Sequence, residues 1–139
     1  MKYLVTGGAG FIGSHITKKL VEKKHNVTVI DNLYTGKEKK LESIKDKIDF
    51  VKGSILDDEL LEDITEDIDG VFHQAALASV QDSFVKPDEY NAVNVNGTEN
   101  ILKLAKKNNF KVVYASSSSV YGNPKRIPIR ESDDKNPIN

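Results

Sequence analysis

The sequence predicts an α/β fold built on a doubly wound parallel sheet. Short apolar or β-branched runs alternate with helical segments along the 139 residues. This alternation is typical of a parallel sheet covered by helices on both faces, and right-handed crossovers then wind it in both directions. Glycines recur every third residue directly after the first run, where a strand would turn tightly into a helix. The length suggests one domain.

Five short segments have the composition of buried strands. Polar or glycine-containing stretches separate each of them from the next helical pattern. The predicted strands are Lys2–Thr6, Asn26–Ile30, Ile48–Val51, a run that starts at Val71 and exits through Ala76, and Lys111–Ser116.

Four segments between the strands have helical patterns. Phe11–Lys24 places apolar residues at helical spacing and charges on the opposite side. Lys37–Ile44 is weakly helical, and Asp57–Ile64 opens with the acids that favour a helix start. Pro87 can begin a long helix across Asp88–Asn108.

Composition excludes several classes of function. The chain is 38% hydrophobic and 29% charged, as is usual for a globular protein. Its net charge of −1 gives no electrostatic reason to expect nucleic acid or an anionic membrane as a partner. It has no cysteine and three scattered histidines, so we expect no disulfide and no metal site. The strand pattern begins at Lys2, and no apolar run approaches the roughly 20 residues of a membrane span. We therefore expect a cytoplasmic protein without a signal peptide.

The glycine turn predicts a site for a diphosphate. Gly7 can take the tight turn, Gly10 can let a diphosphate approach the backbone, and Gly13 can let the helix pack closely. The free N–H groups and the dipole of the helix start attract an anion. The spacing is G-x-x-G-x-x-G rather than G-x-G-x-x-G, so an ordinary loop is the alternative for the turn taken alone.

Asp31 strengthens the dinucleotide interpretation. It lies at the end of the second predicted strand, 18 residues after Gly13. A carboxylate there can accept hydrogen bonds from both hydroxyls of an adenosine ribose. It would also repel a 2′-phosphate, so NAD is favoured over NADP. Alone, Asp31 could be a loop acid; together with the glycines it predicts NAD binding.

Five motifs in order resemble one known family. They are "TGGAGFIG" from Thr6, "DNL" from Asp31, "HQAA" from His73, "NVNGT" from Asn94 and "ASSSSVYG" from Ala115. The chain resembles the NAD-dependent nucleotide-sugar epimerases and dehydratases of the extended short-chain dehydrogenase/reductase group, over about residues 2–139. The resemblance implies a Rossmann-like fold.

The resemblance also implies a role for each matching residue. Contacts with the diphosphate would come from Gly7, Gly10, Phe11 and Ile12, and contacts with the adenosine ribose from Asp31 and Asn32. Ser54 and Ile55 would flank the adenine, Ala75 and Ala76 would border the nicotinamide half, and Asn94 would support the wall of the site. The family often has Asp where Ser54 stands.

Ser117 is the catalytic hydroxyl that the S-x-x-V-Y-G pattern implies. It would donate a hydrogen bond to the 4-oxygen of the sugar and relay its proton; the alternative for a run of four serines is a polar turn. His73 could titrate near neutrality. Because it lies in an apolar strand, we expect a satisfied structural imidazole rather than a catalytic group.

The family's reaction also needs a Tyr-x-x-x-Lys pair on one face of a helix. Only Tyr121 has a lysine four residues on, Lys125, and "YGNPK" contains glycine and proline, so it is not a helix. We expect residues 1–139 to be an incomplete NAD-binding domain of a longer enzyme. The helix carrying the tyrosine and lysine and the C-terminal sugar-nucleotide domain would lie outside it.

The resemblance implies an NAD-dependent 4-epimerase that acts on a UDP-hexose, such as UDP-glucose, UDP-galactose or an N-acetylated or uronic analogue. The sugar would pass through a transient 4-keto form, and the full-length enzyme would be a homodimer. A dehydratase or decarboxylase of the same family is the first alternative. Ser118 and Ser119 stand where dehydratases place Asp-Glu, which disfavours dehydration. A catalytically inactive dinucleotide-binding module is the second alternative.

Overall fold

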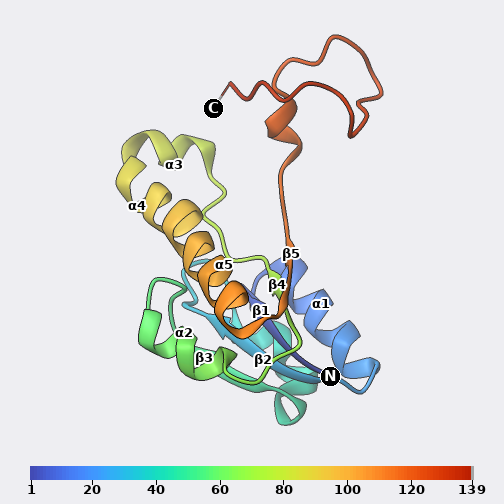
Figure 1. Ribbon diagram of the computed structural model, residues 1–139, viewed down its shortest axis with the longest axis vertical. Helices are drawn as coiled ribbons and strands as arrows, with labels where there is room; N and C mark the ends of the chain where they lie inside the picture. The colour runs from blue at the N-terminus through green and yellow to red at the C-terminus, as the bar shows by residue number, and fades with distance from the viewer. Residues whose placement is uncertain (139) are drawn as a thin grey trace.

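The computed structural model describes residues 1–138, and its centre is a five-stranded, wholly parallel sheet (Figure 1). The order β3-β2-β1-β4-β5 places β1 in the middle, with the chain winding first to one edge and then to the other. The predicted doubly wound fold is therefore confirmed. The strands are β1 (Lys2–Thr6), β2 (Asn26–Asp31), β3 (Asp49–Lys52), β4 (Gly70–His73) and β5 (Lys111–Tyr114).

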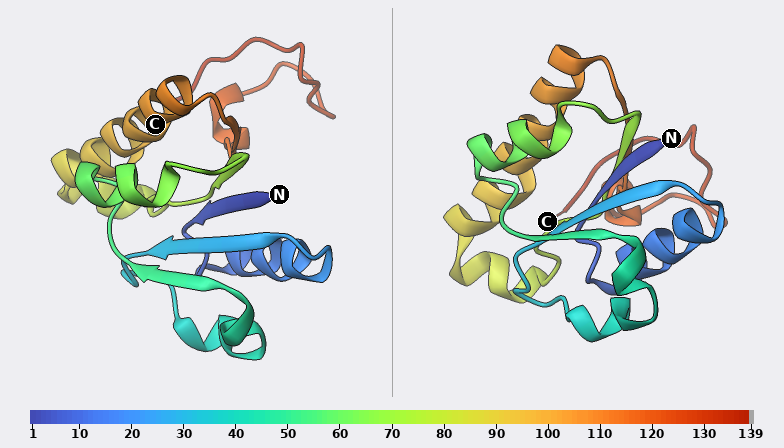
Figure 2. Two further views of the ribbon diagram at one scale, coloured as in Figure 1. Left: turned by 60° about the horizontal axis from the view of Figure 1, so that its bottom comes forward. Right: turned by 90° about the horizontal axis from the view of Figure 1, so that it is seen from below.

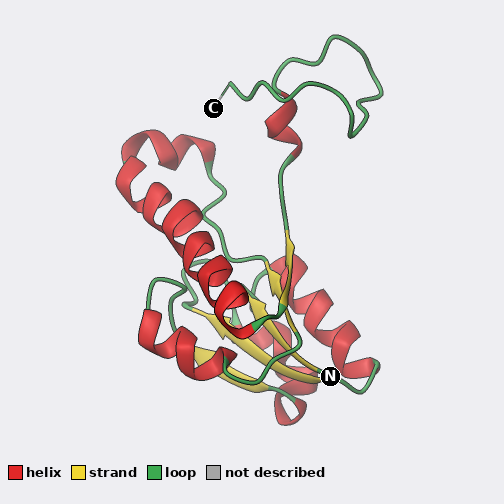
Figure 3. Ribbon diagram, viewed as in Figure 1, coloured by secondary structure: helices red, strands yellow, loops and turns green. Residues whose placement is uncertain are grey.

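Helices cover both faces of the sheet (Figure 2). On one face lie α1 (Phe11–Glu22) and the 3₁₀ helix η1 (Glu38–Lys47), and on the other lie α2 (Asp58–Thr65) and α5 (Gly97–Asn108). Figure 3 shows the strands enclosed between these helices. None of the helices within residues 1–138 is both long and apolar enough to cross a membrane.

Each face of the sheet has its own hydrophobic core. Leu4 and Val5 are neighbours on β1, and both are fully buried because successive strand side chains point to opposite faces. Leu4 packs with Leu61 of α2 and Ile101 of α5. Val5 packs on the other face with Leu20 of α1. The two cores hold the carboxyl ends of β1, β2 and β4 in fixed relative positions.

Local chemistry explains several element boundaries. The carboxylate of Asp57 accepts a hydrogen bond of 3.1 Å from Leu60 N, so Asp57 caps α2 and the helix itself begins at Asp58. β2 continues through Asp31, one residue beyond the prediction. β5 ends at Tyr114 rather than Ser116.

The prediction of one long helix over Asp88–Asn108 is wrong in one respect, because the structure divides this segment into three helical parts. It consists of α4 (Pro87–Asn91), a π-helical segment η2 (Ala92–Asn96), and α5. A further helix, α3 (Val80–Val85), precedes it and was not predicted. Ser79 caps α3 by accepting a hydrogen bond from Asp82 N, so the Ser-x-x-Asp spacing was the signal available in the sequence.

After β5 the chain leaves the sheet. A short 3₁₀ helix, η3 (Ser118–Tyr121), follows, and residues 123–138 form neither helix nor strand. Figure 1 shows this excursion, in red, standing away from the sheet. Asn139 lies outside the described residues.

Candidate cofactor site

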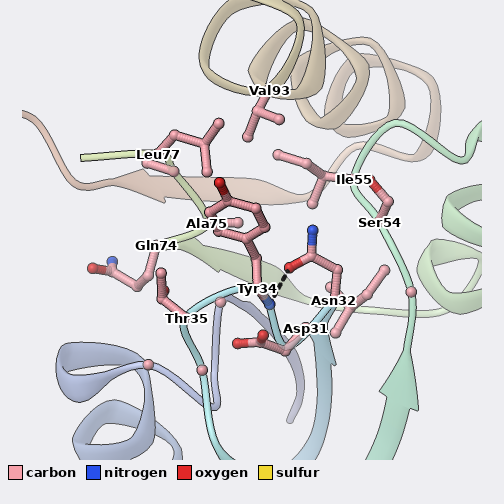
Figure 4. Close-up of a pocket in the computed structure, with 16 residues that line it drawn as sticks. Asp31, Asn32, Tyr34, Thr35, Ser54, Ile55, Gln74, Ala75, Leu77 and Val93 are labelled. Atoms are coloured by element: carbon pink, nitrogen blue, oxygen red, sulfur yellow. Dashed lines mark hydrogen bonds between the residues drawn. The ribbon is translucent and has the colours of Figure 1, made fainter. Parts of the chain in front are cut away.

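A hollow opens at the carboxyl ends of β1, β2 and β4, where ligands of doubly wound sheets bind (Figure 4). The glycine turn after β1 and the loops after β2, β3 and β4 line it, and Val93 of η2 closes one side. The hollow brings together eight of the residues predicted to bind the cofactor: Gly7, Gly10, Asp31, Asn32, Ser54, Ile55, Ala75 and Ala76.

The glycine turn is shaped by close backbone packing. Gly7 has a φ of +67°, and a Cβ on it would lie 2.8 Å from Ala75 N. A Cβ on Gly13 would lie 2.2 Å from Gly7 O, so the first turn of α1 packs directly on the glycine turn. A Cβ on Gly10 would meet, among residues 1–138, only Gly7 O at 3.0 Å. The fold thus requires glycine at 7 and 13, whereas a Cβ at 10 would meet a single backbone oxygen at the short limit of real contacts.

The start of α1 presents free backbone donors beside this opening. Gly10 precedes the helix in an extended conformation, and no side chain within residues 1–138 caps it. The first N–H groups of an α-helix have no intrahelical partner and carry the positive end of its dipole. Phe11 and Ile12 are 74% and 60% exposed. This arrangement fits a diphosphate, which is the anion that the sequence predicted here.

Asp31 has a structural role that sequence reasoning missed. Its Oδ2 accepts a hydrogen bond of 2.9 Å from Ala9 N in the glycine turn, and its Oδ1 accepts one of 2.8 Å from Leu33 N. The residue is only 8% exposed. The carboxylate therefore fastens the glycine turn to the end of β2. Each oxygen keeps a further lone pair, so these contacts are compatible with hydrogen bonds from ribose hydroxyls.

Tyr34 is a lining residue that the sequence analysis did not single out. Asn32 Oδ1 accepts a hydrogen bond of 3.0 Å from Tyr34 N, and the ring of Tyr34 rises into the hollow towards Leu77 and Val93 (Figure 4). Across the opening, Ser54 Oγ accepts a hydrogen bond of 3.2 Å from Leu56 N. An aromatic residue directly after "DNL" was the available signal for Tyr34.

Asn94 lies outside the lining of the hollow but holds part of its wall. Its Nδ2 donates to Leu77 O at 2.9 Å, and its Oδ1 accepts from Leu77 N at 2.8 Å. Leu77 lines the hollow, so Asn94 acts on it through this pair of hydrogen bonds. The π-helical segment that contains Asn94 is the interruption of the predicted long helix, and such segments often occur at functional sites.

His73 is a buried imidazole with both ring nitrogens in hydrogen bonds. Nδ1 lies 2.7 Å from Thr6 Oγ1, and Nε2 lies 3.0 Å from Thr98 Oγ1. Burial lowers the pKa of His73 to about 4, so the ring is neutral at neutral pH. The prediction of a satisfied structural imidazole is confirmed.

Ser117 stands apart from the hollow. It is exposed, lies beyond the end of β5, and caps η3 by accepting a hydrogen bond of 3.2 Å from Ser119 N. The structure therefore does not bring the predicted catalytic hydroxyl together with the predicted cofactor residues. Within residues 1–138 no three histidine or acidic side chains come together as a metal ion would need.

The chain is similar to proteins that act on nucleotide sugars. UDP-N-acetyl-alpha-D-glucosaminuronate decarboxylase of Bacillus cytotoxicus is 43% identical over 132 residues, which are 95% of this chain and 41% of that protein. The structure of UDP-N-acetylglucosamine 4-epimerase from Methanobrevibacter ruminantium M1, in complex with UDP-N-acetylmuramic acid, matches with a TM-score of 0.92 and 41% identity, covering 99% of this chain and 44% of that one.

A third match comes from a structure with a bound cofactor. UDP-glucose 4-epimerase from Brucella ovis, in complex with NAD, matches with a TM-score of 0.87 and 39% identity, covering 99% of this chain and 42% of that one. The chain thus spans less than half the length of each of these three proteins. The family model described as the NAD dependent epimerase/dehydratase family matches residues 3–139. The chain therefore belongs to the NAD-dependent epimerase/dehydratase family.

Proposed function

We propose that residues 1–139 are the NAD-binding part of a nucleotide-sugar 4-epimerase. One observation carries the proposal: the uncapped start of α1 and the carboxylate of Asp31 border the same hollow and are joined by the Ala9–Asp31 hydrogen bond. An anion-binding helix start beside a ribose-binding acid is the recognition pattern of a dinucleotide. The similarity to 4-epimerases supports the same assignment.

The diphosphate would be held by the backbone of the glycine turn. Gly10 lines the hollow without a side chain, and Phe11 and Ile12 supply free N–H groups at the positive end of α1. Gly7 and Gly13 contribute by letting the turn, the loop after β4 and the helix pack closely.

The adenosine would lie between the loops after β2 and β3. Asp31 and Asn32 would bind the ribose, and Ser54 and Ile55 would flank the adenine from the opposite side of the hollow. The negative charge of Asp31 would disfavour a 2′-phosphate, which is the reason to expect NAD rather than NADP.

Ala75 and Ala76 would border the nicotinamide half of NAD, and Asn94 would keep their loop in place through Leu77. When bound, NAD supplies a hydride acceptor and donor at C4 of the sugar. Ser117 Oγ accepts a hydrogen bond from Ser119 N, and its hydroxyl would donate its proton to the 4-oxygen of a substrate. The tyrosine and lysine of the reaction, and the domain for the sugar nucleotide, would come from residues outside 1–139, and the complete enzyme would be a homodimer.

A UDP-sugar decarboxylase is a second candidate, because a relative with that name is 43% identical. The two activities give different products from a UDP-sugar. An epimerase interconverts C4 epimers, whereas a decarboxylase releases carbon dioxide from a uronic sugar.

Turnover by the full-length protein separates these candidates. We expect C4 epimers to form from UDP-glucose or UDP-N-acetylglucosamine, without carbon dioxide from UDP-glucuronate. Ser117→Ala should lower kcat by about 100-fold, the contribution of a positioned proton donor, and leave NAD affinity unchanged. Ser119→Ala removes a neighbouring hydroxyl and serves as the matched control. Full activity of the Ser117→Ala variant would exclude Ser117 as the catalytic hydroxyl.

A further inference from the structure

The loop Gln74–Leu77 lies between the glycine turn and η2, and all four of its residues line the hollow. Its backbone is pressed against Gly7: a Cβ on Gly7 would lie 2.8 Å from Ala75 N and 2.9 Å from Ala75 Cα. A small shift of this loop would therefore enter the space that we assign to NAD. The residues that hold the loop where it leaves β4 therefore affect cofactor binding.

Thr6, at the end of β1, holds this end of the loop. Its Oγ1 accepts hydrogen bonds of 3.1 Å from Ala75 N and from Gln74 N, and the second of these N–H groups is shared with Thr6 O. Because both acceptor positions of the hydroxyl are in use, its proton is directed to His73 Nδ1 at 2.7 Å.

The other side of the His73 ring is fixed by Thr98 on α5. The hydroxyl of Thr98 donates to Asn94 O at 2.8 Å, so its oxygen must accept from His73 Nε2 at 3.0 Å. Every proton in the series is thereby assigned, and His73 is the neutral form with hydrogen on Nε2. A continuous series of hydrogen bonds runs from the backbone of η2 to the amide of Ala75.

We propose that His73 is a positioning residue for the cofactor, which keeps Ala75 against Gly7 by orienting the hydroxyl of Thr6. The proposal rests on NAD binding in the hollow. His73 itself does not line the hollow and is only 2% exposed, so it acts through Thr6. The side chain of Asn94 holds the other end of the same loop at Leu77. The backbone carbonyl of Asn94 is also the last acceptor in the series of hydrogen bonds through His73. Both ends of the loop therefore depend on η2.

Thr98 offers the cleanest test, because it is half-buried and does not line the hollow. Thr98→Val removes the acceptor for His73 Nε2 without changing the size of the side chain. We expect NAD affinity to fall about fivefold, the effect of one lost hydrogen bond. Amide hydrogen exchange at Ala75 should accelerate in the chain without ligand. Thr98→Ser, which restores the hydroxyl, should restore both values.

The matched control is Thr65→Val. Thr65 is a fully buried threonine whose hydroxyl bonds within its own helix, to Leu61 O, and it lies away from the loop. The Thr65→Val variant should be less stable than the wild type, while its NAD affinity and its amide hydrogen exchange at Ala75 stay unchanged. A merely structural role for the His73 series would give the same pattern for Thr98→Val, and that result would overturn the proposal.

The His73→Leu variant provides a second test of the same series of hydrogen bonds. Combined with Thr98→Val, it should weaken NAD binding no further than His73→Leu alone, because both changes break one series. Additive losses would contradict the proposal. If the wild-type chain does not bind NAD, the proposed function fails; unchanged exchange at Ala75 in Thr98→Val is the separate result that removes the role of His73.

Discussion

The region around β1, α1 and β2 and the region from β5 onwards differ sharply, although their strands are similar in composition. Leu4, Val5 and Val29 are fully buried, whereas Val113 and Tyr114 of β5 are 53% and 56% exposed. Within residues 1–138, β1 is paired on both sides, while β5 lies at the edge of the sheet and is paired with β4. Among the described residues, burial therefore follows the position of a strand in the sheet, because strands of similar composition are buried at its centre and exposed at this edge.

The same contrast divides the candidate site. On the side of β1 and β2, the glycine turn and Asp31 are locked together by backbone packing and by the Ala9–Asp31 hydrogen bond. On the side of β5, Ser117 is exposed and has a local partner in η3. The cofactor side is thus organised by contacts within the described residues, and the predicted catalytic hydroxyl lies apart from it.

The largest effect should come from Gly13→Ala. Its Cβ would lie 2.2 Å from Gly7 O and 2.8 Å from Gly8 Cα, and both are backbone atoms that cannot move without displacing the turn. We expect a loss of about 3 kcal/mol or more in the free energy of unfolding. Thermal unfolding should show a midpoint lower by about 10 °C.

Gly10→Ala is the matched control for that variant. Its Cβ would meet, within residues 1–138, only Gly7 O, at 3.0 Å rather than 2.2 Å, so the stability loss should be clearly smaller than for Gly13→Ala. NAD affinity should instead fall by about tenfold, because the methyl group occupies the space assigned to the diphosphate. Equal stability losses in the two variants would contradict the assignment of packing to Gly13 and of ligand approach to Gly10.

A smaller effect comes from one change made in both regions. Val29→Ala in β2 removes two methyl groups from a fully buried core position and should destabilise the fold by about 2 kcal/mol. Val113→Ala in β5 removes the same atoms from a half-exposed edge strand and should cost less than about 1 kcal/mol. Chemical denaturation of both variants measures the difference, and equal losses would show that β5 is packed as tightly as β2.

The sequence was sufficient for the fold and for much of the candidate site. The five strands and their doubly wound arrangement follow from short apolar runs, because such runs must be buried on both faces of a parallel sheet. The positions of Gly7, Gly10 and Asp31 around one hollow follow from the carboxyl ends of neighbouring strands meeting at one edge. Local pattern and topology together determine these features.

Other features depend on contacts between distant residues. The division of the long helix at η2 accompanies the hydrogen bonds between Asn94 and Leu77, which the apolar periodicity of the helix does not record. The contact of Asp31 with Ala9 and the series through His73 join residues 22 and 67 positions apart in the chain. Sequence spacing alone could suggest that these residues are polar and buried, but not which partners they have.

Amide NMR spectra of the 139-residue chain during titration with NAD test the central claim most directly. We predict that the largest shifts fall on the amides from Gly7 to Gly13 and from Asp31 to Gly36, and that NADP gives the same changes only at concentrations at least about tenfold higher. Saturable shifts confined to other residues, or equal responses to NAD and NADP, would contradict the assignment of the hollow as an NAD site.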